Sequence, residues 1–180
     1  MSTLIILFSL LGFLFLMIGL AGLFLPASWV VEKAELIQAV PAELFPLINN
    51  LEEWPNWTVW SPDNKDASLK FEYKEKKEGL GAVQIWKSTR INGILTITHS
   101  ELNKEVQYQF DILEGKLSLL GTIVLASADS NYTQIAWRCK LKTLDNNPIR
   151  RYQAFFLKNY FDTTIQGSLS SLQSIYESEL

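Results

Sequence analysis

Length, composition and charge exclude several classes of protein. The chain has 180 residues with 16 Lys or Arg and 19 Asp or Glu, a formal net charge of −3. That imbalance is too mild for a nucleic-acid partner, which normally needs a basic face. The single cysteine, Cys139, excludes an intramolecular disulfide, and the single histidine, His99, excludes a multi-histidine metal site. No metal or other cofactor is expected.

The N-terminal segment is an apolar run. The first 25 residues carry no charged side chain, and within residues 4–25 only Ser9 is appreciably polar. As a helix this run would reach roughly 33 Å, enough to cross a bilayer. A cleaved signal peptide is the alternative, but no Lys or Arg precedes the run and no Ala-x-Ala site precedes Trp29. Residues 1–28 are therefore predicted to be a single-pass membrane anchor, with Trp29 at the membrane interface.

Residues 29–180 have the length of one domain. A first strand is expected over residues 30–39, a helix over residues 41–50, a further helical turn over residues 51–54 and a loop over residues 55–67. Alternating apolar and polar side chains with short turns then predict an antiparallel meander. Its strands are expected near residues 69–73, 83–88, 93–100, 105–113, 117–126 and 132–143.

The chain closes with a long amphipathic helix, which Asn147 can cap and Pro148 can begin. Its apolar stripe is predicted to pack against the sheet. The stripe comprises Ile149, Tyr152, Phe156, Tyr160, Thr164, Ser168, Leu172 and Ile175. The predicted fold class is α+β, a curved antiparallel sheet that grips this helix. Such a sheet tends to leave apolar space beneath the helix, which an apolar ligand can occupy.

Several motifs resemble the polyketide cyclase/dehydrase and lipid-transport group of the START/Bet v 1-like superfamily, also known as SRPBCC. They are residues 36–57 (LIQAVPAELFPLINNLEEWPNW), Trp60-Ser61-Pro62 with Asp63, Gly79-x-Gly81-Ala82 with Trp86, Trp137, and Gly167-Ser168-Leu169 with Leu172. The resemblance covers about residues 30–178 and implies a helix-grip fold that encloses a hydrophobic ligand. An apolar N-terminal anchor before such a domain is similar to many bacterial members. The chain departs from the group by lacking a second tryptophan after Pro62, which leaves the ligand open.

Twelve residues on the faces expected to point inward are candidate ligand contacts. They are Trp57, Trp60, Phe71, Trp86, Leu95, Ile97, His99, Tyr108, Phe110, Trp137, Phe156 and Tyr160. Core packing alone explains most of these aromatic residues. Trp86 is ambiguous, because a bulge near Gly81 could exchange the faces of its strand. His99 shares strand parity with Leu95 and Ile97 and is expected to be a polar contact or a locally satisfied histidine.

The leading functional hypothesis is a membrane-anchored protein that binds or transports a lipid or other hydrophobic small molecule. No catalytic residue is assigned. One alternative is a cyclase-like enzyme in which His99, Tyr108 or Asp111 moves protons. Another is a non-catalytic module that recruits a protein through its tryptophan loop. The sequence leaves open the ligand, the pathway, the oligomeric state and the side of the membrane, because the charges flanking the apolar run are mixed in sign.

Overall fold

A computed structural model describes residues 2–61, 67–89, 92–143 and 147–177. Pro62 and Asp63 of the tryptophan-rich motif lie outside these ranges. The described elements follow the expected order: a long helix, a strand, two short helices, six strands and a long C-terminal helix. They are α1 (Ser2–Phe24), β1 (Ser28–Ile37), α2 (Pro41–Asn49), α3 (Trp54–Trp57), β2 (Lys70–Tyr73), β3 (Val83–Lys87), β4 (Gly93–Glu101), β5 (Glu105–Ile112), β6 (Leu117–Ser127), β7 (Thr133–Thr143) and α4 (Pro148–Glu177).

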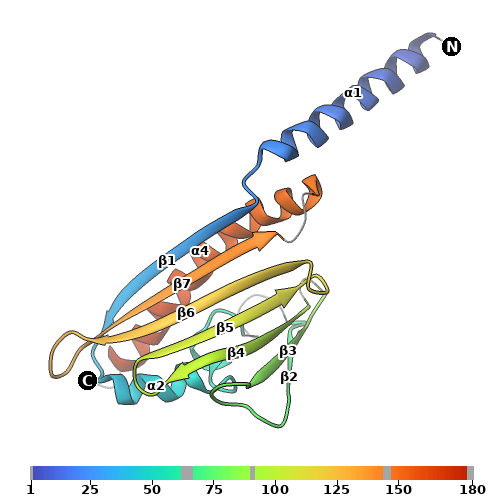
Figure 1. Cartoon of the computed structure of the whole chain (residues 1–180). Helices are drawn as coiled ribbons and strands as arrows, with labels where there is room; N and C mark the ends of the chain where they lie inside the picture. Colours follow the sequence, from blue (N-terminus) through green and yellow to red (C-terminus); the bar gives the residue numbers. More distant parts are fainter. Residues whose placement is uncertain (1, 62–66, 90–91, 144–146, 178–180) are drawn as a thin grey trace.

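The strands form one antiparallel sheet in the order β1-β7-β6-β5-β4-β3-β2. Strands β2 to β7 follow one another as a meander, and β1 closes the sheet beside β7. Helix α4 lies over β1 and β7, while α2 and α3 fill the connection from β1 to β2 (Figure 1). The predicted helix-grip architecture is therefore confirmed.

Strand β5 shows why the sheet has one dry and one wet face. Val106, Tyr108, Phe110 and Ile112 are buried, and the intervening Gln107, Gln109 and Asp111 are not. Successive strand side chains point to opposite faces, so this period of two turns every second residue into the interior, where the Tyr108 ring centroid lies 5.2 Å from that of Trp54 on α3. We call the face away from α4 the outer face of the sheet.

Helix α3 differs from the predicted local structure. Residues 51–54 were expected to form the helical turn and residues 55–67 a loop, whereas α3 spans Trp54–Trp57. Pro55 occupies an early position of the helix, where its missing N–H costs no hydrogen bond. The shift places Trp57 on a helix, with Trp54 and Trp57 both buried.

Helix α1 extends away from the sheet, and its last turns contact the start of α4 (Figure 1). Its segment Thr3–Phe24 is long and apolar enough to cross a membrane, a composition that signal sequences share. The place of Trp29 at a membrane interface stays a prediction, although its side chain packs inside the domain. The indole is buried, and its Nε1 donates to the backbone oxygen of Ala154 on α4 at 2.7 Å.

Candidate ligand-binding site

Eight aromatic rings meet in the space between the sheet and α4. We call them the aromatic cluster: Trp54, Trp57, Trp60, Trp86, Tyr108, Phe110, Trp137 and Phe161. Trp60 lies at its centre, with ring centroids 5.5 Å from Trp86, 5.8 Å from Trp137 and 5.7 Å from Phe161. These separations are typical of edge-to-face aromatic contacts. The rings therefore pack directly against one another, which differs from the open space expected beneath the helix.

Short helices hold one side of the cluster. Trp54 Nε1 donates to the backbone oxygen of Ile48, and Trp57 Nε1 donates to that of Leu47, both at 3.0 Å. The two acceptors belong to the last turn of α2, where carbonyl groups lack partners within the helix. The two indoles thus satisfy the end of α2 while their rings remain in the interior.

On the sheet side of the cluster, one buried glutamine side chain hydrogen-bonds to three other groups. Buried Gln84 accepts a hydrogen bond from Trp86 Nε1 at 2.7 Å and donates to the backbone oxygen of Leu51 and to Tyr73 Oη, both at 3.2 Å. Gln84 thus satisfies the Trp86 indole without contact with water. Trp86 points inward, which resolves its ambiguous orientation in the sequence.

Tyr108 crosses the floor of the cluster over a glycine. A Cβ at Gly121 would lie 1.9 Å from Tyr108 Cζ, so a larger residue at position 121 would displace the ring. Trp137 Nε1 donates to Tyr108 Oη at 2.9 Å. Burial raises the pKa of Tyr108 well above its usual value and raises the pKa of Cys139 to about 12. Both groups are therefore neutral near pH 7.

Trp60 is held differently from the other five tryptophans. Its Nε1 donates to Tyr160 Oη at 3.1 Å, and Tyr160 is 39% exposed. The other indoles donate to backbone oxygens or to the buried side chains of Gln84 and Tyr108. Next to Trp60, Val59 N donates to Ser168 Oγ at 3.0 Å. Trp60 thus joins the chain after α3 to the middle of α4.

Nine of the twelve candidate ligand contacts face the interior. They are Trp57, Trp60, Phe71, Trp86, Leu95, Ile97, Tyr108, Phe110 and Trp137, of which Phe71 is half-buried. Their role in binding a ligand stays a prediction. Phe161, a buried member of the aromatic cluster, was not among the candidates.

Three candidates are oriented differently from the prediction. His99 is exposed, because a β-bulge between Ile97 and His99 shifts the register of β4 against β5 and breaks the alternation on which the prediction depended. Phe156 is 67% exposed, and Tyr160 is 39% exposed, with its hydroxyl accepting from Trp60 and its ring centroid 5.5 Å from that of Phe161. In this half of α4, the buried residues are instead Ala154 and Phe161.

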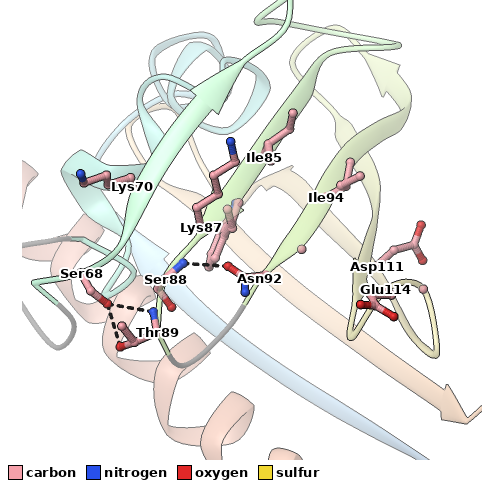
Figure 2. A pocket seen from close by; sticks show the side chains of 13 residues that line it. Ser68, Lys70, Ile85, Lys87, Ser88, Thr89, Asn92, Ile94, Asp111 and Glu114 are labelled. Carbon is pink, nitrogen blue, oxygen red and sulfur yellow. Dashed lines mark hydrogen bonds between the residues drawn. The ribbon is translucent and has the colours of Figure 1, made fainter.

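A separate pocket of about 900 Å³ lies on the outer face, at the ends of β2 to β5 (Figure 2). Lys70, Ile85, Lys87 and Ile94 line it, together with residues of the β3–β4 and β5–β6 turns. Lys87 Nζ is 2.7 Å from Glu72 Oε2, and the Ser68 and Thr89 hydroxyls are 3.0 Å apart. Of the twelve candidates only Trp86 contributes to this pocket. The sequence did not indicate it, because turn residues far apart in the chain form it.

The residues proposed for an enzyme do not converge. Tyr108 is buried in the interior, Asp111 lines the outer pocket and His99 is exposed. Across the described ranges, no group of three or more His, Cys, Asp or Glu side chains is arranged to hold a metal ion. Trp60, in the tryptophan loop proposed to recruit a protein partner, is also buried.

No protein-family model and no curated protein matches the sequence. Solved structures do match. The XoxI protein from Bacillus cereus is 15% identical with a TM-score of 0.58, over 82% of this chain and 94% of that one. Ara h 8.0201 is 16% identical with a TM-score of 0.56, over 84% of this chain and 99% of that one. A protein from Thermobifida fusca is 10% identical with a TM-score of 0.60, over 82% and 92% of the two chains.

These likenesses agree with the strand order and with the position of α4. At such low identity they show the fold alone. The chain has the helix-grip fold of the START/Bet v 1-like superfamily, as its sequence motifs predict.

Proposed function

We propose that this protein binds a lipid or other hydrophobic small molecule between its sheet and α4, close to the membrane that holds residues 4–25. In this proposal residues 1–28 are the single-pass anchor and residues 29–180 are the ligand-binding domain. The fold supports hydrophobic ligand binding in general. The apolar helix Thr3–Phe24 and the aromatic lining of the interior support the membrane source and the apolar ligand.

The position of Trp60 is the observation that carries the proposal. Its ring separates Trp86 and Trp137 of the sheet from Phe161 of α4, and its side-chain hydrogen bond is to half-exposed Tyr160. Breaking one hydrogen bond of this kind costs about 0.5–1.5 kcal/mol. In our proposal an apolar ligand displaces the Trp60 ring and occupies the space between the same three neighbours.

Binding energy would come mainly from apolar burial, at about 25 cal/mol per Å² less the cost of ordering the ligand. Two hydroxyls supply polar contacts. Within the described part of the chain, two buried hydroxyls have no hydrogen-bond partner: Thr58 Oγ1 in the segment after α3, and Thr164 Oγ1 on α4. A buried hydroxyl without a partner is costly, so a ligand headgroup that pairs with either would gain that energy.

Photo-crosslinking of the full chain in lipid nanodiscs tests this proposal. The probe is a fatty acid carrying a diazirine, and the labelled peptides are identified by mass spectrometry. We expect labelling at Trp86 and Phe161 in the natural chain. We expect several-fold more in Trp60→Ala, because the ligand no longer has to displace the indole ring.

Phe45→Ala is the matched control, since Phe45 is a buried aromatic residue of α2 outside the aromatic cluster. It should leave the labelling of Trp86 and Phe161 unchanged. Labelling confined to α1 and to the exposed side of α4, in the natural chain and in Trp60→Ala alike, would overturn the proposal.

A further inference from the structure

The first half of α4 has an apolar face that the sheet does not cover. Ile149, Phe155 and Phe156 are 65%, 43% and 67% exposed. At 100° per residue, Ile149 and Phe156 point away from buried Ala154 and Phe161, so they lie on the side opposite the core. Large exposed apolar patches of this kind usually mark an interaction site.

The end of α1 is attached beside this face. Arg151 Nη1 donates to the backbone oxygens of Leu23 at 2.6 Å and Leu25 at 3.0 Å. A helix C-terminus leaves its last carbonyls without partners and carries partial negative charge, so a guanidinium group stabilises it. The cation therefore fixes the start of α4 to the end of α1.

A second set of contacts reaches further along α1. Tyr152 Oη donates to the backbone oxygen of Ile18 at 2.8 Å. A Cβ at Gly22 would lie 2.8 Å from both Pro148 Cβ and Tyr152 Cε2, so this glycine permits the close approach of the helices. Ile18 precedes Phe24 by six residues, or about 9 Å of helix. The first turn of α4 is thus level with the last turns of α1.

The first half of α4 carries more basic than acidic side chains, and the carboxylate that follows it, Asp162, is paired with Lys33 at 3.0 Å. Residues 147–161 contain Arg150, Arg151 and Lys158 and no Asp or Glu, in a chain whose net charge is −3. At 100° per residue, Arg151 and Lys158 lie within about 60° of Phe155, whereas Arg150 lies on the side of buried Phe161. Basic residues beside exposed aromatic side chains are typical of segments that lie in the interface of anionic membranes. The two features together select a bilayer surface over an uncharged protein groove.

We infer that the face formed by Ile149, Phe155 and Phe156 docks on the surface of the bilayer that α1 crosses, with exposed Lys158 toward anionic headgroups. The inference rests on the membrane anchoring in the proposed function. It places the α1-proximal end of the sheet, where Ser28, Gly93 and Leu117 begin their strands, next to the lipid (Figure 1). The domain is then held in one orientation.

Fluorescence quenching in nanodiscs tests the docking with the full chain. An environment-sensitive label is placed on Phe156→Cys, and the bilayer contains phosphatidylcholine, phosphatidylglycerol and a lipid with a shallow doxyl quencher. We expect about twofold lower emission than without quencher, because the label would sit at the headgroup boundary. Replacing phosphatidylglycerol with phosphatidylcholine should reduce this quenching. Cys139 is buried, and the labelled natural chain gives its background.

Two control positions separate the possible failures. Leu102→Cys carries the label on an apolar residue that is 73% exposed in the β4–β5 turn, at the other end of the sheet, and should not be quenched. Gly12→Cys, measured with the doxyl group deep in the acyl chain, reports the insertion of α1, because Gly12 lies near the middle of the span. If Gly12→Cys is quenched and Phe156→Cys behaves like Leu102→Cys, the docking is wrong although the anchor stands. An unquenched Gly12→Cys label contradicts the anchor itself.

Quenching at Phe156→Cys that requires two chains in one disc would identify a second copy as the occupant and overturn the bilayer assignment.

Discussion

The six tryptophans show how single residues build the interior of this protein. Each buries a large apolar ring, and each donates its indole N–H to a protein oxygen. Because an unpaired indole N–H would be costly to bury, these hydrogen bonds fix each ring in position. Trp60 is held least firmly, since its acceptor is the half-exposed Tyr160.

Two hydroxyls on α4, four residues apart, give a matched pair of substitutions. Ser168 Oγ accepts from Val59 N and donates to the Thr164 backbone oxygen, so Ser168→Ala should lower the free energy of unfolding by about 1 kcal/mol. Thr164 Oγ1 is buried without a partner among the described residues, so Thr164→Val should not lower it. Chemical denaturation of the full chain in detergent measures both. A loss in Thr164→Val equal to that in Ser168→Ala would show that the Thr164 hydroxyl has a partner.

Cys139 and Tyr108 predict the response to alkaline pH. Burial raises the pKa of Cys139 from 9.0 to about 12 and also raises that of Tyr108. Between pH 9 and pH 12 the unfolded chain loses the Cys139 proton that the folded chain keeps. The contribution of this thiol to stability is therefore fully present below about pH 9 and is lost as the pH rises toward 12. Denaturation at a series of pH values should therefore show a shallower decline for Cys139→Ala. An identical slope in the two chains would contradict the raised pKa of this thiol.

At the scale of elements, α4 shows where sequence reasoning succeeds and where it fails. Its start at Pro148 and its amphipathic character were predicted correctly. The stripe through Ile149 and Phe156 was assigned to the core, but in the structure those residues face outward. Periodicity finds an apolar face without identifying what covers it, and the first half of α4 has two apolar sides. The β4 bulge is a similar case, since a one-residue irregularity exposed His99.

The junction between α1 and α4 predicts the effect of a larger side chain at position 22. In Gly22→Leu the new side chain would collide with Pro148 and Tyr152 and separate the helices. The first turn of α4 should then fray, and amide exchange over residues 150–154 should accelerate by about an order of magnitude. Hydrogen-exchange mass spectrometry in nanodiscs measures this. Gly19→Leu, at a position with no neighbour within 4 Å, is the control and should leave the exchange unchanged.

At the scale of the whole molecule, the helix-grip fold could be predicted from the order and period of its segments. Short turns leave few topologies for a meander followed by one long helix, and the motifs around Trp60 and Gly79 agreed with that arrangement. The filling of the interior could not be predicted. Whether rings leave a gap depends on rotamers and on the position of α3, which the sequence placed several residues too early.

The central claim is that an apolar ligand enters the aromatic cluster by displacing Trp60. The most direct measurement is fluorine NMR of the full chain in nanodiscs, with fluorotryptophan at all six tryptophan positions and each resonance assigned by a Trp→Phe substitution. On titration with oleate, the resonances of Trp60 and its neighbour Trp86 should shift, while that of Trp54, held against the end of α2, should move least. Six resonances that stay unchanged while the bilayer takes up oleate would contradict the account.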